Sequence, residues 1–337
     1  MIKRVFKKAL RKLKKLFPKL FVQYQYLRAE VITQYKQLPE KYRKSNLVGY
    51  MFNYFIFGCS VDEYNCLFFE KRNAKSKREF VTMRKNRRLD RMFNKAEAND
   101  VLWNKGLFNE HYSSFNKRAT LIIDPDTADE AIDEFIEKCQ GKSVILKPTY
   151  MYYGIGVHKA ENMDEIKQLR DEGKRYVAEE MISNCKELAK LNESSLNTLR
   201  CVTVIDNKGE VRFITIALRT GGRGAVVDNV LAGGTYYHVD IDTGIIDRKG
   251  MDAFGNDCYL KHPSSGVVMP GFQIPRFEEM KEYVKLLAKH LPNARYVGWD
   301  VAITLDSFEV IEGNVSPGAC SMQCDQKGAF KRILSCK

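Results

Sequence analysis

The sequence predicts an α/β (α+β) fold in two subdomains, preceded by a basic region that is mainly helical. From about residue 118, apolar runs of strand type alternate with helical segments, and after residue 197 the runs are mostly strands. Residues 1–120 hold 28 Lys and Arg against 10 Asp and Glu, whereas residues 121–337 hold 27 against 32. The 337 residues are enough for one large or two medium domains. The basic front part is expected to face something acidic.

Residues 2–20 form the most regular part of the basic region. Apolar side chains recur there at helical spacing, and Lys and Arg fill most positions between them. This pattern predicts a basic amphipathic helix on an anionic membrane surface, where each Lys or Arg adds about 1 kcal/mol. A solvated helix docked on the protein itself is the alternative, and nucleic acid is a weaker third one. Residues 71–91 are also basic but lack interleaved aromatic residues, which favours a solvated helical face over nucleic-acid binding.

The nine cysteines show no metal-ligand spacing, and residues 1–20 lack the uninterrupted apolar core of a signal peptide. A reducing, cytoplasmic setting is therefore expected. No stretch reaches the roughly 18 apolar residues of a membrane-spanning helix. The nearest one, Leu47–Val61, is interrupted by Asn53 and Ser60, which favours a buried or interfacial segment.

The elements of the α/β part follow in order along the chain. The segment Thr127–Cys139 is predicted to be a helix, because acidic residues are enriched in its first turns. Gly141 predicts the end of this helix. A turn at residues 207–209 joins two strands as a hairpin. The predicted strands are Ala119–Ile123, Ser143–Lys147, Arg175–Met181, Leu199–Ile205 and Val211–Leu218, and the further helices are Asp164–Arg170 and Phe277–His290.

Two more runs of strand type, Tyr296–Thr304 and Phe308–Asn314, lie near the C-terminus. If the three residues between them form the loop, antiparallel pairing puts Asp300 opposite Glu312, and Asn314 shares that face. Adjacent carboxylates repel unless a cation lies between them, and Mg²⁺ prefers such oxygen ligands. A two-residue loop would instead shift the register and turn Asp300 to the other face, and an exposed acidic hairpin is the remaining alternative.

Three upstream features predict contacts with a nucleotide. Lys147 ends a buried strand and needs an anionic partner, and Gly154 and Gly156 follow in a loop whose backbone can approach phosphates. The run Tyr176–Ile182 ends in acidic residues and can offer backbone groups to a purine edge. Arg200 enters a strand, where its guanidinium is rigid enough to clamp phosphate oxygens.

These features, in this order, resemble the ATP-grasp superfamily. More closely, the chain is similar to the sugar-transfer-associated ATP-grasp proteins of bacterial envelope-polysaccharide gene clusters, over about residues 100–325. The closer match is carried by Trp103–Lys105, Asn197–Arg200, Asp228–Asn229 with Gly233–Gly234, and Glu312–Gly318. The resemblance implies an ATP-grasp fold in which two α+β subdomains, residues 101–190 and 191–337, clamp ATP. An amphipathic helix (1–20) and a mainly helical region (21–100) precede them. This front part does not resemble the Rossmann-type domain that usually precedes the ATP-grasp subdomains.

The resemblance also implies a role for each site residue. The expected ATP-binding residues are Lys105, Lys147, Thr149, Gly154, Gly156, Glu179, Glu180, Met181, Ile182 and Glu187. Among them the two lysines meet phosphates, the loop Thr149–Gly156 closes over them, residues 179–182 meet adenine and Glu187 meets the ribose. The loop is richer in tyrosine than in many relatives. Asp300, Glu312 and Asn314 are expected to bind Mg²⁺.

The expected catalytic residues are Arg200, Arg219, Arg223 and Asn229. Arg200 is expected to hold the γ-phosphate or acyl-phosphate oxygens, and Arg219 and Arg223 to engage an anionic acceptor.

The activity implied is that of a carboxylate ligase. ATP would convert a carboxylate to an acyl phosphate, and an amine or another nucleophile would displace phosphate, on an envelope glycan or its lipid-linked precursor. Such a protein is expected in the cytoplasm, at the inner face of the membrane, without a transmembrane segment or nucleic acid. One alternative is a kinase of the same fold that phosphorylates a sugar or other hydroxyl. The other is a non-catalytic nucleotide-binding module at the membrane surface, against which the complete set of polar site residues argues.

Overall fold

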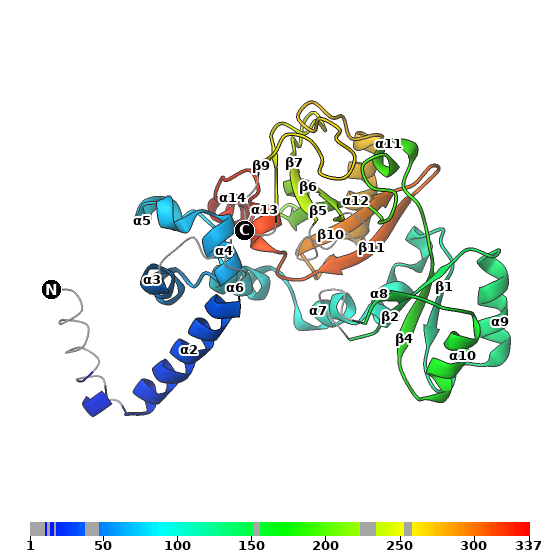
Figure 1. Ribbon diagram of the computed structural model, residues 1–337, viewed down its shortest axis with the longest axis horizontal. Helices are drawn as coiled ribbons and strands as arrows, with labels where there is room; N and C mark the ends of the chain where they lie inside the picture. The colour runs from blue at the N-terminus through cyan, green and yellow to red at the C-terminus, as the bar shows by residue number, and fades with distance from the viewer. Residues whose placement is uncertain are drawn as a thin grey trace.

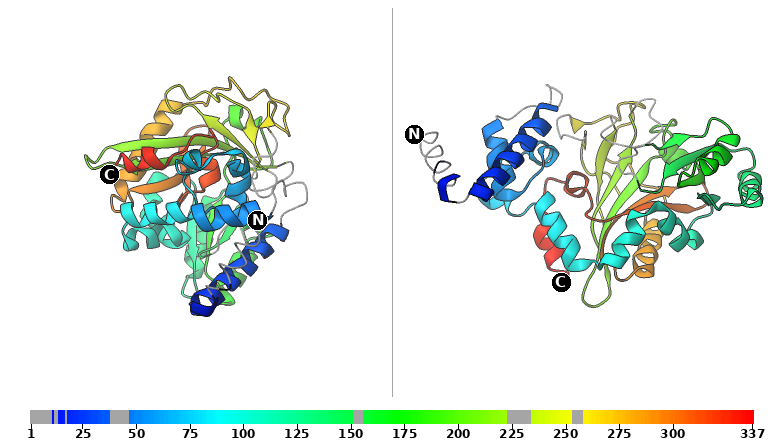
Figure 2. Two further views of the ribbon diagram at one scale, coloured as in Figure 1. Left: turned by 90° about the vertical axis from the view of Figure 1, so that its left-hand side faces the viewer. Right: turned by 90° about the horizontal axis from the view of Figure 1, so that it is seen from below.

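The structure, a computed structural model, describes residues 11, 14–16, 18–37, 47–150, 156–222, 234–252 and 258–337. The chain forms a helical N-terminal part, a four-stranded sheet and a seven-stranded sheet, which confirms the predicted α/β (α+β) class. The helical part lies at one end of the molecule and the small sheet at the other, with the large sheet between them (Figures 1 and 2). Most of the predicted amphipathic helix, together with Gly154, Arg223 and Asn229, lies outside the described residues.

The helical N-terminal part has a small core of its own. Ser60 and Glu63 form a capping box at the start of one of its helices, each side chain bonding the backbone N–H of the other. Tyr50, Leu67 and Phe69 are buried together in this core. The helices are α2 (Pro18–Gln37), α3 (Leu47–Phe57), α4 (Val61–Cys66), η2 (Phe69–Lys71), α5 (Ala74–Lys77), α6 (Met83–Phe93), α7 (Ala96–Trp103) and α8 (Lys105–His111). Among the described residues, no helix combines the length and the apolar composition needed to cross a membrane.

Helix α6 connects the helical part to the large sheet. Leu89 and Phe93 are buried one turn apart, while the side chains of Arg87, Arg88 and Arg91 are exposed. The prediction of a solvated basic face is therefore confirmed for this helix. The helical part is also joined to α13 (Ala319–Met322) by a disulfide between Cys66 and Cys320. The sequence analysis did not predict this pairing.

The small sheet is antiparallel, in the order β1 (Thr120–Ile123), β4 (Tyr176–Glu180), β2 (Val144–Pro148) and β3 (His158–Lys159). Two helices, α9 (Asp129–Lys138) and α10 (Asp164–Asp171), pack on one face. Val144, Leu146 and Ala178 point to that face and are buried against Ile132 and Leu169. Because side chains alternate along a strand, Lys147 and Glu179 point to the opposite face.

The large sheet is also antiparallel and follows the order β11-β10-β5-β6-β7-β8-β9. Its strands are β5 (Thr198–Ile205), β6 (Val211–Thr220), β7 (Thr235–Val239), β8 (Gly250–Met251), β9 (Cys258–Tyr259), β10 (Tyr296–Ile303) and β11 (Phe308–Asn314). One face packs on α7, α8 and α12 (Phe277–His290), with Trp299 fully buried among them. The short elements η3 (Ser113–Phe115), α11 (Lys186–Ala189) and α14 (Phe330–Leu334) complete the described structure.

The hairpin of β10 and β11 differs from the prediction at its loop and agrees with it at the site. The predicted three-residue loop is wrong. Phe308 pairs with Ile303, so the loop has four residues, 304–307. A β-bulge then leaves Ile311 as the extra residue of β11, so that Asp300 still lies opposite Glu312. The predicted pairing of these two carboxylates is therefore confirmed.

Candidate functional site

A row of charged residues crosses four neighbouring strands of the large sheet. Arg200 of β5 lies opposite Asp300 of β10, which in turn lies opposite Glu312 of β11. Arg219 of β6 lies two residues beyond Ala217, the neighbour of Arg200, and so points to the same face. The sheet thus gathers four charged side chains on the face opposite Trp299.

Asp300 binds two guanidinium groups. Its side chain is buried, and it accepts hydrogen bonds from Nε and Nη2 of Arg200, the latter at 2.8 Å, and from Nη1 of Arg219 at 2.6 Å. Burial alone would raise the pKa of Asp300, but the two guanidinium charges outweigh it and hold the pKa well below its usual range. Asp300 is therefore ionised and fully paired. Arg219 binds Asp300 here, and its predicted role toward an anionic acceptor stays a prediction.

Glu312 is held more loosely. It accepts a hydrogen bond from Nδ2 of Asn314 at 3.0 Å, and the same nitrogen lies 3.5 Å from Oδ2 of Asp300. Burial raises the pKa of Glu312, and the neighbouring charge of Asp300 raises it further. Two carboxylates that share a site without a cation between them behave in this way.

The donor set of these three side chains fits Mg²⁺. Two carboxylates and an amide converge, and Mg²⁺ commonly takes few protein ligands and fills its shell with water and phosphate oxygens. Within the described part of the chain, no group of three or more His, Cys, Asp and Glu side chains is placed to hold a metal ion on its own. Two carboxylates and one amide would leave the rest of the Mg²⁺ coordination shell to water and phosphate oxygens, and the metal assignment stays a prediction.

Gly298 lets two other groups approach this row. It lies two residues before Asp300, on the same face. A Cβ atom at this position would lie 2.9 Å from Cβ of Pro317 and 3.2 Å from Cδ of Arg200, so a side chain here would push both away. Asn86 of α6 holds the same loop by donating to the carbonyl of Pro317 at 2.6 Å. The helical N-terminal part thus supports the site directly, which the sequence analysis did not predict.

A second charged group lies on the small sheet. Nζ of Lys147 binds Oε2 of Glu179 at 2.7 Å, so the predicted anionic partner of Lys147 is a neighbouring strand residue. The same oxygen accepts from Nε of Arg118 at 3.1 Å, and Oε1 accepts from Asn109 at 3.4 Å. Burial would raise the pKa of Glu179, but Arg118 and Lys147 outweigh it and hold the pKa below its usual range.

Lys105 lies between the two charged groups. It begins α8, after the cap residue Asn104, and its backbone N–H donates to the carbonyl of Thr149 at 3.1 Å. Burial lowers the pKa of Lys105; Glu312 of the large sheet opposes this, while Lys147 of the small sheet lowers the pKa further. The field of both sheets therefore reaches this ammonium group, as expected for a site between them.

Two described residues, Thr149 and Gly156, lie at the ends of the predicted phosphate loop. Thr149 is buried and donates through its N–H and its hydroxyl to the carbonyl of Arg175, at 3.2 and 3.3 Å. Gly156 has a φ of +74°, and a Cβ there would lie 2.9 Å from Pro148, so only glycine suits this position. Both residues frame the predicted phosphate loop.

The residues predicted to meet adenine differ in their surroundings. The side chain of Glu180 binds Lys142 and the N–H of Ala119, and therefore does not point to the face of Glu179. The N–H of Met181 donates to the carbonyl of Ser143 at 2.7 Å, so this group is not open to a purine. Ile182 follows outside the ladder, and Glu187 is exposed in α11. The predicted contacts of residues 179–182 with adenine and of Glu187 with the ribose stay predictions.

Two charged residues of the site were missed from the sequence. Arg118 precedes β1 and is buried, and Glu309 of β11 accepts from it at 3.0 Å. A signal for Glu309 was present, because a carboxylate next to the apolar residues of a short strand must find a partner when it is buried. No such signal identified Arg118 as that partner.

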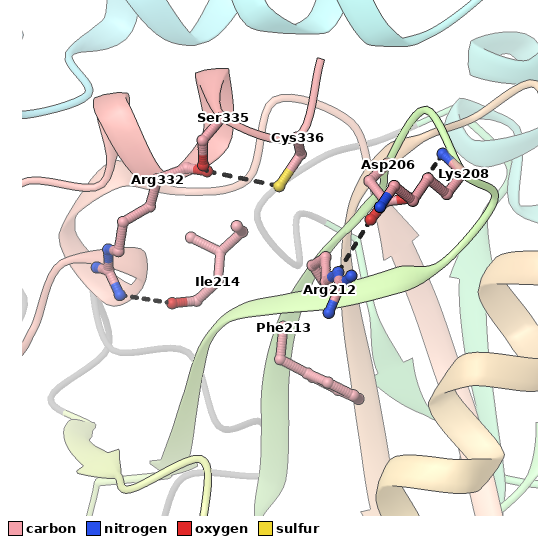
Figure 3. A pocket seen from close by; sticks show the side chains of 8 residues that line it. All are labelled: Asp206, Lys208, Arg212, Phe213, Ile214, Arg332, Ser335 and Cys336. Carbon is pink, nitrogen blue, oxygen red and sulfur yellow. Dashed lines mark hydrogen bonds and ion pairs between the residues drawn. The ribbon is translucent and has the colours of Figure 1, made fainter.

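A separate pocket of about 440 Å³ lies at the turn end of the β5–β6 hairpin, whereas Arg200 and Arg219 lie at its other end (Figure 3). Arg212 already pairs with Asp206 at 2.9 Å, and Arg332 donates to the carbonyl of Ile214 at 2.9 Å. Because both arginines are engaged, this pocket is not assigned a ligand.

The comparisons with solved structures give distant matches. D-alanyl-alanine synthetase A of Vibrio cholerae matches at 13% identity and a TM-score of 0.44, over 72% of this chain and 62% of that one. D-alanine-D-alanine ligase of Helicobacter pylori matches at 14% and 0.44, over 72% and 62%. The N5-carboxyaminoimidazole synthetase of Staphylococcus aureus, complexed with ADP, matches at 14% and 0.45, over 77% and 58%. This chain spans less than two thirds of the length of each of these proteins.

No curated protein matches the sequence. A family model described as sugar-transfer associated ATP-grasp matches residues 168–337, just over half of the chain. That region holds Arg200, Arg219 and the three predicted metal ligands. The chain therefore belongs to the sugar-transfer associated ATP-grasp family, as its resemblance predicted.

Proposed function

We propose that this chain is a Mg-ATP-dependent ligase whose nucleotide lies between the two sheets. ATP-grasp enzymes are ATP-dependent ligases and use ATP with Mg²⁺. The observation that carries the proposal is the position of Lys105 at the start of α8, a helix that contacts both sheets: Asn109 donates to Glu179 of the small sheet at 3.4 Å, and Phe108 packs in the core of the large sheet. Cations for phosphates and oxygen ligands for a metal are thus close enough to act on one triphosphate.

In this proposal, Lys105 and Lys147 bind phosphate oxygens, and Asp300, Glu312 and Asn314 hold the metal. The bound Mg²⁺ supplies positive charge next to the phosphates. The guanidinium groups on Asp300 are rigid because the carboxylate holds them, and they can neutralise oxygens of the transferred group. Little covalent chemistry falls to the protein, since positioning and charge account for most of phosphoryl-transfer catalysis.

The reaction proposed has two steps. A carboxylate oxygen of the acid attacks the γ-phosphorus, the bond to the ADP oxygen breaks, and an acyl phosphate forms. An amine or another nucleophile then attacks the acyl carbon, phosphate leaves, and the nucleophile loses its proton. Arg223 and Asn229 remain proposed residues of the acceptor site. The family's association with sugar transfer favours an envelope glycan or its lipid-linked precursor, in capsule or O-antigen formation, as the acceptor class.

The first test is incubation of the full chain with Mg-ATP and candidate uronic acids, amino acids and amines. A ligase releases free phosphate in step with ADP and gives a product whose mass is the sum of the two substrates less water. Transfer of the phosphate to a sugar hydroxyl would support the kinase of the same fold and contradict the ligase. Nucleotide binding without turnover across all acids and amines would contradict both.

We also place the protein at the inner face of the cytoplasmic membrane, bound to anionic lipid through residues 1–20. Helix α3 supports this, because it carries no charged residue and exposes Val48, Phe52 and Ile56 by 73%, 59% and 57% at a spacing of one helical turn. Such an apolar stripe is unusual on a solvated helix and suits a membrane surface. A basic group lies beside this helix as well, because Nζ of Lys77 is 5.6 Å from the ring centre of Phe57 at its end.

Sedimentation with vesicles tests this placement. The full chain is expected to sediment with vesicles that contain phosphatidylserine and to stay in solution with phosphatidylcholine alone. Deletion of residues 1–20 should abolish sedimentation but spare ATP binding. Undiminished sedimentation of the deleted chain would contradict the role of residues 1–20.

A further inference from the structure

Arg118 lies in the linker between η3 and β1, where the chain enters the small sheet. Its side chain is only 1% exposed. A buried guanidinium needs partners for all of its nitrogen atoms, because an unpaired charge inside a protein is strongly disfavoured. In the structure, each of the three guanidinium nitrogens of Arg118 has a partner.

These partners belong to both sheets. Nε binds Oε2 of Glu179 on the small sheet at 3.1 Å. Nη1 binds Oε2 of Glu309 at 3.0 Å, and Nη2 donates to the carbonyl of Val310 at 3.0 Å, both on the large sheet. Glu309 is fixed in turn by the N–H of Lys117 at 2.9 Å. One side chain therefore sets the small sheet against the last strand of the large one.

On the small sheet, Arg118 shares its carboxylate with the phosphate-binding lysine. Oε2 of Glu179 accepts both from Arg118 and from Nζ of Lys147. When Lys147 turns to a phosphate, Glu179 keeps one cation and is not left buried and unpaired. Arg118 thereby lowers the cost of releasing Lys147.

On the large sheet, Arg118 holds the strand at the point where its register changes. Glu309 and Val310 directly precede Ile311, the extra residue of the bulge, and Glu312 follows it. The bulge is what brings Glu312 opposite Asp300. A contact that fixes the backbone just before the bulge therefore fixes the place of Glu312.

We propose that Arg118 is a positioning residue that aligns the phosphate-binding lysine of one sheet with the metal-binding carboxylate of the other. The inference rests on the proposed function, because it concerns the same nucleotide site. Arg118 acts through Glu179 and through the strand at Glu309, without touching the substrate. It makes the linker between the subdomains part of the nucleotide site.

The test compares Arg118→Gln, Arg118→Lys and Glu309→Gln with the wild type. Titration calorimetry gives the affinity for Mg-ATP and for ATP with EDTA, and turnover gives the half-saturating Mg²⁺ concentration. Arg118→Gln should weaken Mg-ATP binding and raise the half-saturating Mg²⁺, each by about tenfold or more, as losses of supporting contacts commonly do. Glu309→Gln should raise the half-saturating Mg²⁺ concentration. It should change the affinity for ATP in the presence of EDTA less than Arg118→Gln does. Arg118→Lys keeps the charge but not the three-way contact, and should fall between the wild type and Arg118→Gln.

Arg170→Gln is the matched control. Arg170 lies on α10, and its partners Asp129 and Asp171 are largely exposed. This variant should leave both constants within about twofold of wild type, because Arg170 and its partners lie with α9 and α10, on the face of the small sheet opposite Glu179.

A merely structural role would lower the melting temperature of Arg118→Gln and leave both constants unchanged, which would overturn the inference. If Arg118→Gln does not fold, Arg118→Lys and Glu309→Gln decide by the same two constants. A wild type that binds no Mg-ATP would instead overturn the proposed function itself, so the two failures are distinguishable.

Discussion

Each sheet buries one carboxylate between two cations. On the large sheet Asp300 binds Arg200 and Arg219, and on the small sheet Glu179 binds Arg118 and Lys147. In both, a cation can turn toward a phosphate while the carboxylate keeps a partner. The common arrangement suggests how a site can hold its charges in place before a nucleotide arrives and still release one of them.

The two groups differ in where their cations originate. Arg200 and Arg219 both come from strands of the same sheet as Asp300. Arg118 comes from the linker and also reaches Glu309 on the opposite sheet. The group at Asp300 is therefore a local unit, whereas the group at Glu179 depends on how the two subdomains meet. Substitutions in the two groups should differ accordingly.

The largest expected effect is that of Asp300→Asn on stability. It leaves two guanidinium groups without a counter-charge, and breaking a buried pair in this way costs about 3–5 kcal/mol. Urea unfolding should show this loss. Asp306→Asn is the control, since Asp306 is exposed and its pair with Lys117 contributes little. A variant Asp300→Asn as stable as Asp306→Asn would show that the arginines do not depend on Asp300.

The next effect separates Glu312 from Asp300. No Lys or Arg pairs with Glu312 among the described ion pairs, and its pKa is already raised by burial and by Asp300, so Glu312→Gln should cost little stability. It removes a metal ligand, and Mg²⁺-dependent turnover should fall by about 100-fold or more. Phosphate release and urea unfolding measure the two quantities. A large stability loss with normal turnover would reverse the assignment.

Two lysine–glutamate pairs of the small sheet test which of its faces binds the nucleotide. Lys147→Ala should weaken ATP binding by about 10- to 100-fold, because it removes a charge-assisted bond to phosphate. Lys142 pairs with Glu180 in the same way, but its side chain is 59% exposed and lies on the other face. Lys142→Ala should therefore bind ATP as the wild type does. Equal losses in both variants would mean that the face of Glu179 is not the nucleotide face.

The smallest effect concerns pH. Because the pKa of Glu312 is raised, its carboxyl keeps a proton above the usual carboxyl range, and Mg²⁺ must displace that proton. The half-saturating Mg²⁺ concentration should therefore rise as the pH is lowered over the range in which the protein stays folded. Phosphate release at each pH measures this. A half-saturating concentration that falls over the same range would contradict the predicted sign.

The parts of the site that come from neighbouring strands were predictable. Asp300 and Glu312 belong to one hairpin, so only its register decides whether they meet, and the bulge at Ile311 compensated for the wrong loop length. Alternation also predicts that the side chains of Glu179 and Glu180, which are adjacent in a strand, point to opposite faces, as observed. The contact of Arg118 with Glu309 joins residues 191 apart, and no local pattern encodes how the two sheets dock.

The central claim is that Mg-ATP binds between the two sheets. Titration calorimetry with Mg-ATP on the wild type, Lys147→Ala and Glu312→Gln tests it most directly, because the two substituted residues lie on different sheets. The account predicts one site per wild-type chain, weakened by EDTA and by each substitution. Wild-type binding that is unaffected by EDTA and by both substitutions would contradict it.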